Sequence, residues 1–83
     1  MTSTHKTRYK AFLKKLKAAR LSAGMTQAQA AAALGKPQSY VSKCESGERR
    51  VDVIELMDFA AVYQKQTSFF VADIPLGSAR SQT

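Results

Sequence analysis

The chain of 83 residues contains a single cysteine, Cys44, so it cannot form an internal disulfide. A chain without disulfides is typical of a reducing compartment, and the cytoplasm is the simplest expectation. No apolar run is long enough to span a bilayer, and residues 1–20 contain no apolar segment of the kind that a signal peptide needs. We therefore expect a cytoplasmic protein with no membrane partner.

The sequence also lacks the residue sets that catalysis and metal binding require. It contains no phosphate-binding glycine loop, no Ser/His/Asp set, no paired carboxylates in a plausible cleft and no cluster of metal ligands. The one histidine, His5, has no Cys, Asp or Glu nearby, which argues against a metal site. These absences predict a protein that is not an enzyme and that binds no metal and no cofactor.

Acidic residues are absent from the first half of the chain. Residues 1–44 hold nine Lys and Arg and no Asp or Glu, whereas residues 45–83 hold four Lys and Arg and six Asp and Glu. The two parts therefore carry formal charges of +9 (nine minus none) and −2 (four minus six). This asymmetry favours a surface for a polyanion, although a merely solubilising basic surface would give the same count.

The spacing of apolar residues predicts an all-α domain. We expect five helices near residues 8–23, 26–33, 38–46, 52–64 and 68–73, within one domain over residues 8–74. The flanking segments 1–7 and 75–83 are expected to be a disordered basic tail and a flexible tail. On the fourth helix, the expected buried residues are Val53, Leu56, Met57, Phe59, Ala60 and Tyr63.

Two alternatives concern the basic N-terminal part. The first helix carries lysines on its outer faces, and taken alone it could be a membrane-surface helix or a transit peptide. Its apolar face is nevertheless needed to complete a core that the alanine-rich segment after it cannot build. Lys6 and Arg8 could form an arm that reaches into a DNA groove, with a loose tail as the simpler expectation.

The stretch from Thr26 to Gly47 predicts two short helices joined by a tight turn. Thr26 with Gln29 forms a capping box, and Gly35 stands where a left-handed helix cap belongs. Pro37 suits the start of the second helix, and Gly47 ends it. Asp52 with Glu55 is a second capping box, at the start of the fourth helix; the two boxes and Gly35 thus mark helix boundaries along the chain.

This stretch resembles the helix-turn-helix of the phage-repressor and Xre-like family of DNA-binding regulators. The matching pieces are TQ at 26–27, the small residue Ala31, Leu34-Gly35 and VSKCESG at 41–47, and the similarity extends over roughly residues 10–73. The resemblance implies a five-helix, phage-repressor-like DNA-binding domain with a central helix-turn-helix. It further implies a transcriptional regulator, most simply a repressor, that binds a pseudo-palindromic double-stranded operator as a homodimer.

The resemblance also implies a structural ion pair between Arg20 and Glu45. In the family, an arginine at this position pairs with the glutamate of an E-x-G motif, which is Glu45-Ser46-Gly47 in this sequence. The physical argument is that a charge buried where helices pack requires a partner. Arg20 would then be unavailable for DNA. Cys44 stands where the family has an aliphatic residue, and we interpret it as a small core residue.

The outward face of the segment 38–46 supplies the candidate base contacts. Gln, Ser and Lys side chains can hydrogen-bond base edges in the major groove, and the candidates are Gln38, Ser39, Ser42 and Lys43. Around them we expect contacts to DNA phosphate from Gln27, Lys36, Tyr40, Arg49 and Arg50. Any exposed helix face is polar, so the pattern alone does not prove this assignment.

The last predicted helix is too apolar for its length. It holds Phe69, Phe70, Val71 and Ile74, more than one face of a short helix buries, which suggests a homodimer interface at Phe69, Phe70 and Ile74. The alternative is that both phenylalanines enter the monomer core. An alternative function is an antitoxin of a toxin–antitoxin pair, which would bind a protein partner through this helix.

Overall fold

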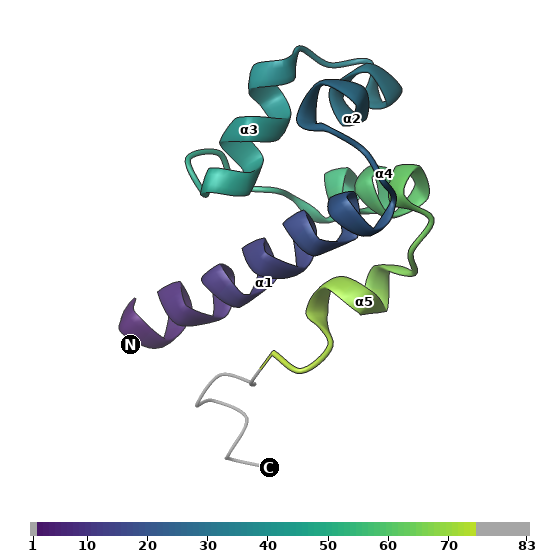
Figure 1. Cartoon of the computed structure of the whole chain (residues 1–83). Coiled ribbons are helices and arrows are strands. Elements are labelled where there is room, and N and C mark those ends of the chain that lie inside the picture. Colours follow the sequence, from purple (N-terminus) through teal and green to yellow (C-terminus); the bar gives the residue numbers. More distant parts are fainter. Residues whose placement is uncertain (1, 75–83) are drawn as a thin grey trace.

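Five helices and no strand make up residues 2–74, the part of the chain whose backbone a computed structural model describes; side chains are described from residue 6. The helices are α1 (Thr2–Ser22), α2 (Gln27–Leu34), α3 (Gln38–Ser46), α4 (Val53–Tyr63) and α5 (Thr67–Val71) (Figure 1). The all-α, five-helix prediction is confirmed. The expected tail at 75–83 lies outside the described residues, and none of the described helices is both long and apolar enough to cross a bilayer.

Helix α1 begins earlier than expected. It starts at Thr2 rather than near residue 8, so the backbone of the predicted disordered tail is helical within the described residues. The segment from Thr2 to Arg20 contains neither glycine nor proline. Extending an existing helix adds one backbone hydrogen bond for each residue that becomes fixed. Since no residue of this segment breaks a helix, α1 extends toward the N-terminus as far as Thr2.

The helix boundaries in the middle of the chain follow the predicted caps. The Thr26 hydroxyl accepts from the Gln29 backbone N–H while the Gln29 side chain accepts from the Thr26 N–H, and Asp52 and Glu55 form the same reciprocal pair before α4. Gly35 ends α2 in the left-handed conformation, at φ 70°. Contacts between residues close in the sequence therefore set both ends of α2 and the start of α4.

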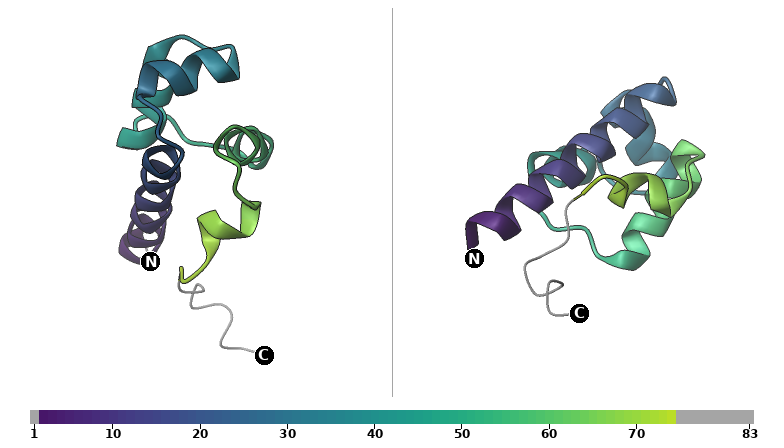
Figure 2. Two further views of the ribbon diagram at one scale, coloured as in Figure 1. Left: turned by 45° about the vertical axis from the view of Figure 1, so that its right-hand side comes forward. Right: turned by 90° about the horizontal axis from the view of Figure 1, so that it is seen from below.

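A single core holds the five helices together. Helix α1 contacts α3, α4 and α5, whereas α2 packs on α3 and α4 (Figures 1 and 2). The core side chains come from every helix; they are Phe12, Leu16, Ala19, Ala30, Ala31, Val41, Cys44, Phe59, Ala60, Tyr63 and Phe70. The interpretation of Cys44 as a core residue is confirmed, and burial raises the pKa of its thiol.

Two sequence predictions about apolar residues are wrong. Phe70 has no exposed surface and lies in the monomer core, so it cannot form part of a subunit interface. Phe69 and Ile74 are half-buried against the same core. Conversely, Val53 and Met57 were expected inside but are 69% and 53% exposed, because α4 turns Phe59, Ala60 and Tyr63 inward. The apolar surface that this monomer exposes therefore lies on α4 more than at the C-terminal aromatic residues.

Candidate nucleic-acid interface

Helix α3 has one buried face and one polar face. Val41 and Cys44 are fully buried, which anchors the helix against α1 and α2. Gln38, Ser39 and Lys43 are exposed. Ser42, which we also expected to contact bases, is half-buried and is less accessible than the other three. The helix therefore presents three exposed groups that can hydrogen-bond base edges, and it cannot rotate without exposing its core residues.

The Arg20–Glu45 pair fixes the C-terminal part of α3 to α1. Arg20 Nε lies 2.6 Å from Glu45 Oε2, and Arg20 Nη2 lies 3.1 Å from Glu45 Oε1, in a two-pronged contact. Arg20 Nη1 also donates to the carbonyl oxygen of Met25 at 2.9 Å. The two side chains of the pair are only 8% and 6% exposed, and the hydrogen bond to Glu45 raises the pKa of Arg20. Both charges are thus engaged inside the protein, as the resemblance implied.

Gln27 is held by the same pair. Its Nε2 donates to Glu45 Oε1 at 3.0 Å, and the side chain is half-buried. We expected Gln27 to meet a DNA phosphate from the start of α2. A primary amide carries two N–H donors and the contact with Glu45 uses one, so the contact orients this side chain and leaves one donor for another partner.

Tyr40, an expected phosphate contact, also has a partner within the protein. Its ring stacks on Phe59 of α4, with centroids 6.0 Å apart and planes 10° apart, and it is half-buried. Burial raises the pKa of Tyr40 to about 12. Phe59 thus supplies, within the monomer, an aromatic contact for the Tyr40 ring. Tyr40 is therefore first a residue that positions α3.

Arg49 is also engaged within the protein. It forms a two-pronged ion pair with Glu55, at 3.0 and 2.8 Å, and its guanidinium lies 4.9 Å from the centre of the Tyr40 ring. The hydrogen bonds from Arg49 lower the pKa of Glu55 to about 2, so the pair persists below the pH at which a free glutamate becomes protonated. An arginine neutralised in this way attracts a phosphate less than an unpaired one does. Arg49 thus links the α3–α4 loop to α4 and lies against Tyr40 of α3, and its contact with a DNA phosphate stays a prediction.

Lys36 and Arg50 keep the properties expected of phosphate ligands. Both are exposed, and both lie over aromatic rings: Lys36 Nζ is 5.2 Å from the centre of Tyr40, and the Arg50 guanidinium is 4.3 Å from the centre of Tyr9. A ring face attracts a cation without neutralising its charge, so it restricts the side chain and leaves its donors available. Lys36 precedes α3 and Arg50 follows it, which places one cation near each end of the polar face.

Comparison with known proteins supports the same interpretation. A helix-turn-helix family model matches residues 16–70. A solved structure of an XRE-family like protein from Pseudomonas syringae pv. tomato str. DC3000 is 45% identical and covers 88% of this chain and 89% of its own, with a TM-score of 0.81.

The chain belongs to the Xre-like helix-turn-helix family. It is accordingly a DNA-binding transcriptional regulator of the Xre-like type. A search of curated protein sequences gives no significant match.

Sequence reasoning missed three residues that shape this Xre-like interface. Glu55 forms an ion pair with Arg49, and the ring of Phe59 stacks on that of Tyr40. The Tyr9 hydroxyl accepts a hydrogen bond from the Val51 backbone N–H at 3.0 Å, and the Tyr9 ring lies under the Arg50 guanidinium. Only Glu55 had a visible signal, because a capping-box glutamate six residues after an arginine can reach it across a loop. The contacts of Phe59 and Tyr9 join distant parts of the chain and left no local pattern.

Proposed function

We propose that this Xre-like chain is a cytoplasmic repressor that binds a pseudo-palindromic DNA operator as a homodimer and reads its bases with α3. The observation that carries the proposal is the way α3 is held. Arg20–Glu45 fixes one end, Tyr40 on Phe59 fixes the side, and both leave the outward face of the helix uncovered. A rigid helix with a polar face is the arrangement that major-groove reading requires.

The charges around α3 support the same assignment. Lys36 and Arg50 flank the polar face, and the first 44 residues carry nine cations and no acid. Neutralising phosphates releases counterions, which supplies affinity for any DNA sequence. Base contacts from Gln38, Ser39 and Lys43 would add the sequence preference.

The antitoxin alternative has less support than the repressor. It relied on an aromatic C-terminal helix that captures a protein partner, but Phe70 is in the core and Phe69 is half-buried beneath Lys15 and Lys65, whose amino groups lie 5.2 and 4.9 Å from its centre. Helix α5 therefore does not offer the aromatic surface on which that alternative depended.

Gln38→Ala tests the reading role of α3. We expect it to weaken binding to the preferred operator by about 1–3 kcal/mol, because a two-pronged contact to a base is lost, while binding to random duplex stays unchanged. Lys36→Gln is the matched contrast: it should weaken both duplexes alike and reduce the salt dependence by about one unit of slope. Binding measured at several salt concentrations separates the two effects. An equal loss on both duplexes for Gln38→Ala would show that α3 does not read bases.

A further inference from the structure

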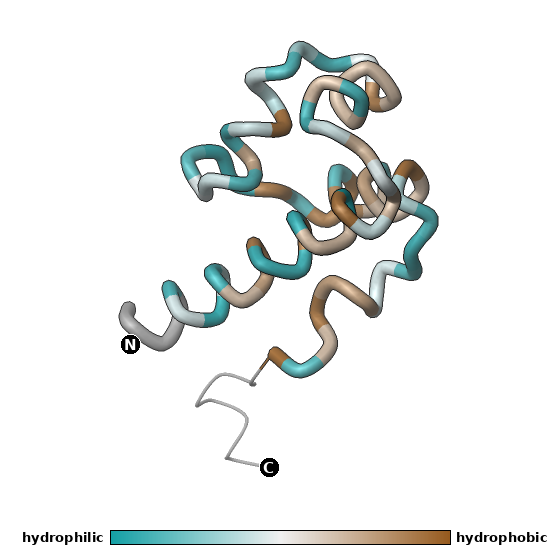
Figure 3. Tube along the Cα trace, in the orientation of Figure 1, coloured by the Kyte–Doolittle hydropathy of each residue, from teal (hydrophilic) through white to brown (hydrophobic). Residues whose placement is uncertain are grey.

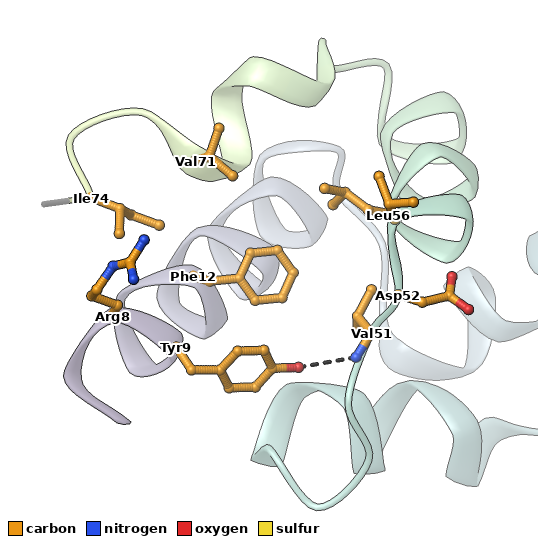
Figure 4. A pocket seen from close by; sticks show the side chains of 9 residues that line it. Arg8, Tyr9, Phe12, Val51, Asp52, Leu56, Val71 and Ile74 are labelled. Carbon is orange, nitrogen blue, oxygen red and sulfur yellow. Dashed lines mark hydrogen bonds between the residues drawn. The ribbon is translucent and has the colours of Figure 1, made fainter. Parts of the chain in front are cut away.

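The side chain of Tyr9 joins the N-terminal part of α1 to the loop 47–52 that follows α3. Its hydroxyl oxygen accepts a hydrogen bond from the backbone N–H of Val51 at 3.0 Å (Figure 4). Its ring lies under the guanidinium of Arg50, 4.3 Å from the ring centre. Tyr9 therefore contacts two consecutive residues of the loop, one through the backbone and the other through the side chain.

The ring of Tyr9 is itself held in place by the core. Phe12, one turn further along α1, is only 8% exposed and belongs to the core. The centroids of the Tyr9 and Phe12 rings lie 5.4 Å apart, with the ring planes inclined by 41°. A tyrosine side chain has few rotatable bonds, so this packing and the hydrogen bond of the hydroxyl leave it little freedom. The surface that Tyr9 offers to Arg50 is therefore rigid.

The peptide unit between Arg50 and Val51 is hydrogen-bonded on both sides. The carbonyl oxygen of Arg50 accepts from Nη1 of Arg49 at 3.1 Å. The N–H of Val51, which donates to Tyr9, belongs to the same planar peptide unit. Fixing that plane also restricts the direction in which the Arg50 side chain leaves the backbone. Tyr9 thus restrains Arg50 twice, at its backbone and at its guanidinium.

The charge of Arg50 stays available for an anion. Arg50 is exposed, and within residues 6–74 it forms no ion pair, whereas its neighbour Arg49 is paired with Glu55. The loop is strongly hydrophilic where it leaves α3 (Figure 3). A guanidinium presents its N–H groups in a planar fork that matches two oxygens of a phosphate. The loop therefore offers a restrained and unneutralised fork directly after α3.

We infer that Tyr9 is a positioning residue for DNA binding, which holds Arg50 in the orientation that binds a phosphate beside the bases read by α3. This rests on the proposed function, in which Arg50 meets a phosphate, and Tyr9 acts on DNA only through Arg50. Ordering a flexible side chain on binding lowers affinity about two- to tenfold, and a side chain that is already ordered avoids this loss. Tyr9 lies outside residues 16–70, which match the helix-turn-helix family model, so the N-terminal part of α1 supplies this contribution.

Tyr9→Leu tests the positioning role in a double-mutant cycle with Arg50→Gln. We expect Tyr9→Leu alone to weaken binding about two- to tenfold, and equally on a duplex selected from a random pool and on random duplex, because a phosphate contact is affected and no base contact is. In the Arg50→Gln background the same change should alter affinity by less than about twofold, since the side chain to be positioned is absent. Titration of labelled duplex at fixed salt measures each affinity.

Lys36→Gln provides the matched control background. Lys36 also lies over an aromatic ring, that of Tyr40, but it stands before α3 and has no contact with Tyr9. Tyr9→Leu should therefore keep its full effect in the Lys36→Gln background. Tyr9→Phe, which keeps the ring and loses only the hydroxyl, should recover most of the affinity that Tyr9→Leu loses. Circular dichroism checks that each variant folds, and Tyr9→Met is a second variant without a ring should Tyr9→Leu fail to fold.

The backgrounds distinguish a positioning role from a contribution to folding alone. An equal effect of Tyr9→Leu in the wild-type, Arg50→Gln and Lys36→Gln chains, or no effect in any of them, overturns the positioning role. Tyr9→Phe binding as weakly as Tyr9→Leu overturns it as well. If the wild type shows no sequence preference but Tyr9 and Arg50 are coupled on random duplex, the positioning role stands and base reading by α3 fails. A wild type with a sequence preference but no such coupling gives the reverse result.

Discussion

Phe70→Ala should lower the free energy of unfolding by about 3–5 kcal/mol, the usual cost of removing a buried phenylalanine side chain. Phe70 has no exposed surface, and its ring meets Phe69 edge-on with centroids 5.3 Å apart. A domain of this size derives only a few kcal/mol from its core, so the variant should be close to unfolding at room temperature. Urea denaturation followed by circular dichroism measures the change.

Phe69→Ala is the control for this prediction. It makes the same chemical change one residue earlier, but Phe69 is half-buried, so its cost should be clearly smaller. An equal loss in the free energy of unfolding for the two variants would show that α5 does not bury Phe70 more deeply than Phe69. A Phe70→Ala chain with unchanged stability but an altered dimer would restore the interface role that the sequence had suggested for this residue.

Glu45→Ala should also destabilise the domain, by about 3 kcal/mol, because it leaves the Arg20 guanidinium buried without its carboxylate. Arg20 would keep its hydrogen bond to the Met25 carbonyl oxygen, and Gln27 would lose its acceptor on Glu45. For a domain of this size each kcal/mol corresponds to about 4–8 °C, so the melting temperature should fall by more than about 10 °C. Thermal unfolding at fixed protein concentration measures it.

Glu48→Ala provides the matched control, since Glu48 is an exposed acid three residues further along. It changes the net charge equally and should alter stability by no more than about 0.5 kcal/mol. Replacing Arg20 and Glu45 together by methionine should recover much of the loss, because well-packed apolar residues can replace a buried ion pair. Similar melting temperatures for Glu45→Ala and Glu48→Ala would show that the pair does not stabilise the fold.

The parts of the fold that local chemistry decides could be predicted from the sequence. Thr26 with Gln29, Asp52 with Glu55, and Gly35 each act within a few residues, and they placed α2 and α4 to within about a residue or two. The pair of Arg20 and Glu45 spans 25 residues, and only the family resemblance brought it into view.

Two contacts around α3 were not predicted from the sequence. The stacking of Tyr40 on Phe59 joins distant parts of the chain and has no local pattern, whereas the pair of Arg49 and Glu55 depends on the geometry of the loop between α3 and α4. The exposure of apolar residues on α4 could have been predicted from the sequence. Only Glu55 and Asp58 are polar in this helix, so a surface helix with so many apolar residues must expose some of them.

Selection of bound duplexes from a random pool, carried out in parallel with the wild type and Gln38→Ala, tests most directly whether α3 reads base sequence. We expect the wild type to enrich two inverted half-sites whose centres are about 10 base pairs apart. Gln38→Ala should relax the preference at one position in each half-site and keep the spacing, because the spacing depends on the dimer and not on α3 side chains. No enriched motif with the wild type, or the same motif at full strength with Gln38→Ala, would contradict the role assigned to α3.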